Sequence, residues 1–475
     1  MNNPKILLDK NEINDIIIYD RSIVEDRNEK LSVTIFKIIG NSLINDIVNF
    51  SDRLLLTINL ILIGHISIQN KTHYELFMVY QIGVSIIEFF GKLIILGLLK
   101  YLFVKKESDE LYNLYLRLKT ALVFIIPIIM IPVSISSYFI LQLLLKNNLD
   151  IYDQSLNREI YFKYLLFTPF IYFFEILFYL NLQLLRSSEE IKALVFYLNF
   201  FLITHIITCW ILLYILEVGI IGLTVSYSLN SFLFYFFSNI YINASNKDED
   251  ENFFLIPFND YFKSNVLTCL KEAGSVSLRN LSDSFIFYLL LIASLFTDRK
   301  QLIVNIIYLN FYDTLIGVNK GSFITLKNYL LYNNESTEKK KKYVVVFSST
   351  FLLFSFSIFI FLMVFKNILL DIYLINGGEK DLKKISNKIN VIYGLCVLFN
   401  GVQILLYGFI RGMALPSPLM RKIVYSLISL LLCLLLCFHF NYGIIGLWIS
   451  VLILCFLYIF ENTYKTVIHF RTFFF

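Results

Sequence analysis

Polar and charged side chains inside otherwise apolar stretches are the residues of this 475-residue chain that could do chemistry. A charge at the centre of a lipid bilayer costs on the order of 3 kcal/mol, so it needs a partner or water there. A carboxylate in such a place can bind a proton or a cation. Asp283 follows Arg279 at a spacing of one helical turn, so it is a candidate either for such binding or for a salt bridge with Arg279.

Similar side chains recur in apolar stretches of both halves of the chain. Each of them alone could make an interhelical hydrogen bond, but together they indicate polar clusters around a water-accessible cavity. Asp52 and Asn59, with Asp46, lie in the first apolar stretch and could form an ion site. The expected cavity residues are Glu175, Gln183, Asp313, Asn400 and Gln403.

The chain has no motif for ATP hydrolysis or for an embedded enzyme. It contains no G-x-x-x-x-G-K-[ST] stretch, its five histidines are scattered, and its six cysteines lie in apolar stretches without metal-ligand spacing. We therefore expect no enzyme activity, no metal and no cofactor. If the protein carries out active transport, a proton or sodium gradient would supply the energy.

The composition predicts the elements that must position these residues. Hydrophobic residues make up 57% of the chain and charged residues 16%, against about a quarter in soluble domains. The net charge of +5 is too small to favour a nucleic-acid partner. These values predict an all-α integral membrane protein of twelve spans. The spans are expected at 39–66, 76–98, 119–144, 162–183, 192–216, 219–242, 264–296, 301–325, 343–366, 390–410, 421–440 and 443–463.

Charge patterning predicts the topology and the division of the chain. Lysine and arginine are more frequent in the loops on the side of the N-terminus, which predicts cytoplasmic termini. The membrane would be the plasma membrane or that of an internal organelle. The charged segment after the sixth span reads as a linker between two halves. The predicted parts are a tail at 1–38, a first lobe at 39–242, a linker at 243–263, a second lobe at 264–463 and a tail at 464–475.

An internal repeat supports this division. Gly219 and Gly222 open the sixth span in the stretch G-I-I-G-L, and Gly443 and Gly446 open the twelfth span in the same stretch. An arginine lies at a similar distance before each copy. Halves with an even number of spans share their orientation, so a pseudo-twofold axis along the membrane normal should relate them. Transporters commonly have this arrangement, although a duplication alone would also produce the repeat.

Three motifs resemble those of a known family. Gly408, Arg411 and Gly412 form G-x-x-R-G in the tenth span, and G-x-x-G-L-W follows at the entry to the twelfth. Gly64 lies in I-G-H-I at the end of the first span. These stretches resemble the multidrug and toxin extrusion (MATE) transporters, and those of eukaryotes in particular. The resemblance implies two six-helix bundles of the MATE type.

The resemblance also implies residue roles and departures from them. Asp283 falls where eukaryotic members have a coupling glutamate, so it keeps the carboxylate on a shorter side chain. Asn400 replaces their second glutamate, and Asn59 replaces an aspartate of bacterial members. An asparagine cannot carry a proton. The number of coupling sites is therefore expected to differ from that of the family.

The function implied by the resemblance is gradient-driven antiport. The protein would export small organic compounds, with cations favoured, by alternating access in exchange for protons or sodium ions. We expect a monomer in the lipid bilayer, with no nucleic-acid partner. Two alternatives stay open: a lipid-linked oligosaccharide flippase of the same superfamily, and a receptor or scaffold on a degenerate transporter fold. The mostly acidic intramembrane charges argue against the flippase, which would bind a pyrophosphate.

Overall fold

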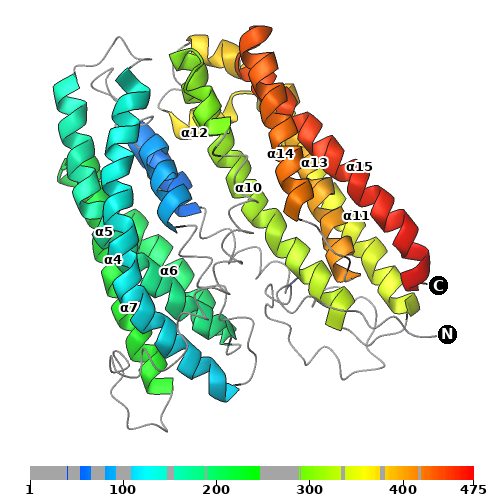
Figure 1. The fold of residues 1–475 in the computed structure, drawn as a ribbon, viewed down its shortest axis with the longest axis horizontal. Helices are drawn as coiled ribbons and strands as arrows, with labels where there is room; N and C mark the ends of the chain where they lie inside the picture. The colour runs from blue at the N-terminus through cyan, green and yellow to red at the C-terminus, as the bar shows by residue number, and fades with distance from the viewer. Residues whose placement is uncertain are drawn as a thin grey trace.

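The described helices of the computed structural model form two bundles that lean against each other (Figure 1). The structure describes residue 40 and residues 54–65, 81–92, 108–146, 154–187, 190–245, 288, 290–332, 337–374, 380–413, 415 and 419–474. Within these residues every regular element is a helix.

The first bundle is built around α5, which packs against α4, α6 and α7. The short helix Leu54–His65 lies on the side of this bundle that meets the second. The other elements are η3 (Glu88–Lys92), α4 (Ser108–Lys146), α5 (Gln154–Ser187), α6 (Ile191–Trp210), η5 (Ile211–Ile215) and α7 (Ile220–Ser245).

The second bundle is built in the same way around α13, which packs against α10, α11 and α15. The starts of α10, α13 and α15 gather at one end, because Lys300 contacts Asp381 and Gln301 accepts a hydrogen bond from the backbone of Ile444. The elements are α10 (Arg299–Tyr332), α11 (Thr337–Val364), α12 (Ile368–Tyr373), α13 (Lys380–Gly412), α14 (Leu419–Leu434), η7 (Leu435–His439) and α15 (Ile444–Phe474).

Seven described helices are long and apolar enough to cross a membrane. The apolar parts of α5 and α10 are 72% buried, so these helices are largely covered by their neighbours, whereas that of α11 is 22% buried and lies at the periphery. The outer faces of the peripheral helices carry exposed phenylalanines and isoleucines, which suit lipid rather than water. The predicted all-α membrane fold is confirmed; the number of twelve spans stays a prediction.

The two bundles share an unusual turn between two helices, called here the corner, at residues 211–222 and 435–446. Both η5 and η7 are single π-helical turns, and each is followed by a non-glycine residue with positive φ, Glu217 (49°) or Asn441 (56°). A left-handed glycine comes next, Gly219 (72°) or Gly443 (54°), and then a new helix begins. Each pair is separated by the same interval in sequence, so the repeat found in the sequence is also a repeat of backbone conformation.

Glycines allow close approach of neighbouring segments at several of the motif positions. A Cβ atom on Gly222 would crowd Leu212, and one on Gly446 would crowd Leu436. On α13, the surfaces of Gly408 and Gly412 lie against side chains of α10. These contacts explain why small residues stand at the motif positions. Arg411, at the end of the same helix, is half-buried and donates from Nε to the Tyr407 hydroxyl at 3.0 Å.

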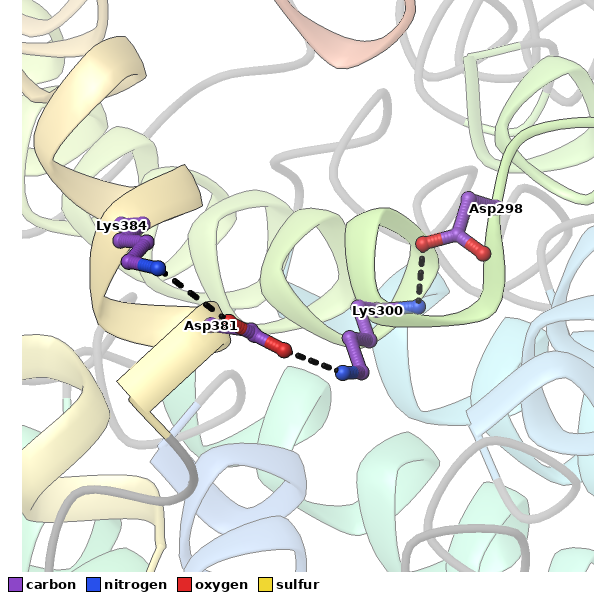
Figure 2. A network of polar contacts seen from close by, with 4 residues as sticks. All are labelled: Asp298, Lys300, Asp381 and Lys384. Carbon is purple, nitrogen blue, oxygen red and sulfur yellow. Dashed lines mark hydrogen bonds and ion pairs between the residues drawn. The ribbon is translucent and has the colours of Figure 1, made fainter.

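A polar network ties the starts of α10 and α13 together (Figure 2). Lys300 Nζ lies 2.6 Å from Asp381 Oδ2, and Lys384 Nζ lies 3.7 Å from the other oxygen of Asp381. Asp298 accepts a hydrogen bond from the backbone nitrogen of Lys300 at the first turn of α10. The paired side chains are 41–77% exposed, so solvent screens the pairs and the network contributes little to stability.

Several helices are longer than the apolar stretches that predicted them. Lys119, at the very start of the expected span 119–144, is buried within α4, and Lys327, beyond the end of the expected span 301–325, is buried within α10. Residues 464–474 continue α15 and do not form a separate tail. A helix continues through its polar ends because its backbone hydrogen bonds do not require apolar side chains.

Candidate functional site

His205 lies at the centre of a polar cluster inside the first bundle. It is on α6, its side chain is fully buried, and its Nε2 atom is 2.7 Å from Oδ1 of Asn59. An amide oxygen only accepts hydrogen bonds, so His205 Nε2 carries the proton in this contact. The other ring nitrogen, Nδ1, is then free to accept, and Ser226 Oγ lies 3.3 Å away on α7.

Four further polar side chains surround this histidine. Ser226 Oγ lies 2.5 Å from the hydroxyl of Thr208, and it accepts a hydrogen bond from the Cys209 thiol at 3.2 Å. Asn230 donates to Thr208 at 2.8 Å. The cluster therefore joins α6 and α7 through a hydrogen-bonded network that the low local dielectric strengthens.

Glu175 extends the cluster to α5. Its side chain is fully buried and shares a hydrogen bond with the hydroxyl of Tyr227 on α7. The ring centroids of Tyr227 and His205 lie 5.3 Å apart. Four helices thus bring Asn59, His205, Tyr227 and Glu175 into one buried cluster, called here the His205 cluster together with Thr208, Cys209, Ser226 and Asn230.

The composition of the His205 cluster suits proton binding better than metal binding. Imidazole and carboxyl groups are the side chains that exchange protons most readily near neutral pH. A hard cation such as sodium would require several oxygen ligands. Here the Asn59 oxygen accepts the imidazole N–H, and the Ser226 and Thr208 hydroxyls are hydrogen-bonded to each other and to Cys209 and Asn230. The described residues hold no group of three His, Cys, Asp or Glu side chains that could bind a metal ion.

The structure brings together two of the site residues predicted from the sequence. Asn59 and Glu175 both belong to the His205 cluster. Gln183 lies two turns beyond Glu175 on α5 and is half-buried. Asp283 and Asp52 lie outside the described residues. The remaining predicted residues are in the second bundle: Asp313 on α10, with Asn400 and Gln403 on α13.

The sequence interpretation missed His205, Tyr227 and the hydroxyl groups around them. His205 stands in the apolar stretch 192–216, and this was the same signal that singled out Glu175. The scattered spacing of the histidines argues only against a metal site, whereas a polar side chain inside a membrane span indicates function by its position alone.

A buried lysine lies at the other end of the first bundle. Lys119 Nζ donates to Asn239 Oδ1 at 2.8 Å and lies 5.5 and 5.8 Å from the ring centroids of Tyr115 and Tyr235. The ammonium group of Lys119 therefore makes one hydrogen bond and two cation–π contacts, all of them with neutral side chains. Lys327 of α10 is buried as well, so the described bundles hold basic side chains beside acidic ones such as Glu175.

Comparison with solved structures finds this fold in MATE transporters. The eukaryotic MATE transporter AtDTX14 superimposes with a TM-score of 0.66 at 15% identity, covering 92% of this chain and 96% of that chain. A multidrug resistance MATE transporter in its inward-facing conformation gives 0.64 at 12% identity, covering 94% of this chain and 100% of the other.

A third neighbour comes from Pyrococcus furiosus, and its binding pocket is described as having reverse polarity, suggesting a different function. It gives a TM-score of 0.58 at 11% identity, covering 90% of this chain and 95% of that chain. No family model matches this chain, and no curated protein is similar to it in sequence. At these identities the likeness establishes the fold, which is the MATE fold that the sequence motifs predicted.

Proposed function

We propose that the protein is a secondary transporter that exports small organic compounds, with cations favoured, in exchange for protons. The observation that carries the proposal is the His205 cluster, a buried imidazole and carboxyl inside the first bundle of a MATE-type fold. Burying such groups is costly and is usually linked to function in membrane proteins. The structural neighbours support transport, since they are transporters of the MATE and MOP families.

Alternating access would couple the proton to the substrate. A proton bound at His205 or Glu175 changes the charge of the cluster and so favours one arrangement of the bundles over the other. Substrate that prefers the opposite arrangement is then linked to proton release. The hydrogen bond from His205 to Asn59 ties the cluster to the helix Leu54–His65, which also contacts the second bundle.

We retain the roles proposed for Asp283 and Asp52 from the sequence, in addition to the role of this cluster. Asp283, which the sequence assigns to the second lobe, would supply a second coupling carboxylate, and Asp52 would belong to a sodium site with Asn59. Because the oxygens of Asn59, Thr208 and Ser226 already take part in hydrogen bonds within the cluster, we favour protons over sodium for the first bundle. Asn400 and Gln403 on α13 would bind the substrate by hydrogen bonds.

The test is exchange in proteoliposomes that contain the full-length protein. With an acidic interior, uptake of a fluorescent organic cation such as ethidium should exceed that of protein-free liposomes, and a protonophore should abolish the excess. His205→Gln and Glu175→Gln should each lower gradient-driven uptake by about tenfold, since the linkage is lost. His439→Gln is the matched control, because His439 is an exposed histidine at the end of η7.

Other outcomes would assign the function differently. Uptake that follows a sodium jump but not a pH jump would move the coupling to sodium. Wild-type uptake that persists in both cluster variants would remove the cluster from the mechanism. Absence of any cation uptake, with movement of a lipid-linked oligosaccharide analogue, would indicate the flippase. Absence of both activities in folded protein would indicate the receptor or scaffold.

A further inference from the structure

The two bundles touch through a set of buried polar contacts at one end of the molecule. Thr57 of the helix Leu54–His65 donates from Oγ1 to Asn310 Oδ1 on α10 at 2.9 Å, and the same hydroxyl lies 2.8 Å from that of Thr314. Tyr373 at the end of α12 donates to the same Asn310 oxygen at 2.6 Å. All four side chains are buried, so three elements from both bundles meet at one amide.

A second contact lies two helical turns further along the same face of this helix. Gly64 approaches the backbone carbonyl of Tyr373 so closely that a Cβ atom would collide with it. The next residue, His65, places Nε2 2.8 Å from the carbonyl oxygen of Ile372, so this nitrogen is the donor. The contact between the bundles therefore extends about 10 Å along the helix.

These contacts lie at the end where α10, α13 and α15 begin. Tyr373 is the last residue of α12, which packs against α10 and α13, and Asp371 of α12 lies 3.4 Å from Lys383 in the first turn of α13. The C-terminus lies at the opposite end of α15 (Figure 1). If the termini are cytoplasmic, as the distribution of basic residues predicts, the contacts close the outer side of the molecule.

We propose that Thr57, Gly64 and His65 form a latch with Asn310, Thr314 and Tyr373 that holds the outer side of the transport path closed. The proposal rests on the proposed function, because a path must exist for the latch to close it. The contacts join different bundles, so they must break when the bundles rock apart. Hydrogen bonds between helices in membranes are weak enough for this, since each changes an equilibrium by about threefold on average.

The latch also connects to the His205 cluster. Thr57 and Asn59 are two residues apart, which places them about 200° apart around the helix axis. Thr57 accordingly contacts the second bundle while Asn59 contacts His205 of the first. A change in the hydrogen bonding of Asn59 would therefore act on the same short helix that carries the latch. Protonation of the His205 cluster could in this way change the stability of the latch on the outer side.

A distance measurement tests the latch without requiring transport. Spin labels attached through Leu216→Cys and Lys380→Cys, at two exposed positions, would report the separation of the bundles at this end in the full-length chain, whose described native cysteines are buried and react slowly with the label. Thr57→Val and Asn310→Leu should each raise the population with the longer separation by about threefold. Ser386→Ala is the matched control, because Ser386 and Tyr308 form a buried 2.7 Å hydrogen bond within the second bundle. Equal distributions in all four proteins would refute the latch.

A cross-link tests its place in the cycle. Thr57→Cys combined with Thr314→Cys should form a disulfide on oxidation, since the native hydroxyls are 2.8 Å apart. Cation uptake should then stop and return with reductant. A cross-linked protein that still transports would overturn the proposal. If the wild type moves no cation, the distance measurement still decides whether the latch exists, so failure of the latch and failure of the proposed function are separable.

Discussion

Alanine substitutions at Gly446 and Gly222 test whether the repeated corner is packed as the structure shows. The two glycines hold equivalent places near the starts of α15 and α7, and each faces the π-helical turn before it. The same substitution in the same motif should nevertheless have unequal effects, because the atoms that the new methyl group meets differ.

The magnitudes follow from the distances. At position 446 the new Cβ would lie 2.7 Å from the carbonyl carbon of Leu436 and 2.9 Å from the backbone nitrogen of Cys437. At position 222 its nearest neighbour is the Cβ of Leu212 at 3.0 Å. Overpacking costs about 1–3 kcal/mol, and replacing glycine by alanine in a tolerant helix stabilises by about 0.4–1 kcal/mol. Gly446→Ala should therefore destabilise by about 1–2 kcal/mol, whereas Gly222→Ala should be nearly neutral.

Thermal unfolding of the detergent-solubilised protein, followed by tryptophan fluorescence, is a suitable assay. Trp448 is fully buried two residues after Gly446, so its emission reports this corner. The prediction concerns the order of the midpoints, with Gly446→Ala below Gly222→Ala and the latter close to the wild type. A Gly222→Ala midpoint equal to or below that of Gly446→Ala would refute the packing argument.

The remaining predictions concern the same corner and the buried lysine. Gly219 and Gly443 both have positive φ, so alanine should lower the free energy of unfolding by about 1 kcal/mol at each. Gly443→Ala should lower it further, because the new methyl group also displaces the Gln301 side chain that accepts a hydrogen bond from Ile444. Chemical unfolding of the two variants would show this order. Asn239→Leu should destabilise by about 1–3 kcal/mol because it removes the acceptor of Lys119, and adding Lys119→Met should recover most of this loss. A double variant no more stable than Asn239→Leu would contradict the second prediction.

The sequence predicts the spans well because membrane helices are long and apolar. The expected spans at 192–216 and 219–242 nearly match α6 with η5 and α7, since Gly219 interrupts the chain between them. The prediction is poorer at the polar ends, where α13 begins at Lys380 and not at residue 390. Hydropathy measures the part of a helix in lipid, whereas backbone hydrogen bonding determines its length. For the same reason the six-residue helix α12 was not predicted.

The site is less visible in the sequence because it is assembled from four helices. Asn59 and Glu175 were found as polar residues in apolar stretches, but nothing in their spacing relates them to His205. The contact from Asn59 to His205 joins residues 146 positions apart in the chain. The latch is less visible still, since Thr57 and Thr314 are common residues in membrane helices. Only the packing of the bundles brings them together.

The central claim is that substrate movement is coupled to protons through the His205 cluster. It is tested most directly by recording the internal pH of proteoliposomes when substrate is added without any imposed gradient. The account predicts that an inward substrate gradient drives protons out of wild-type liposomes, so that the interior becomes alkaline, and that liposomes with His205→Gln show no such change. Substrate entry without a pH change in the wild type, or an unchanged pH response in His205→Gln, would contradict it.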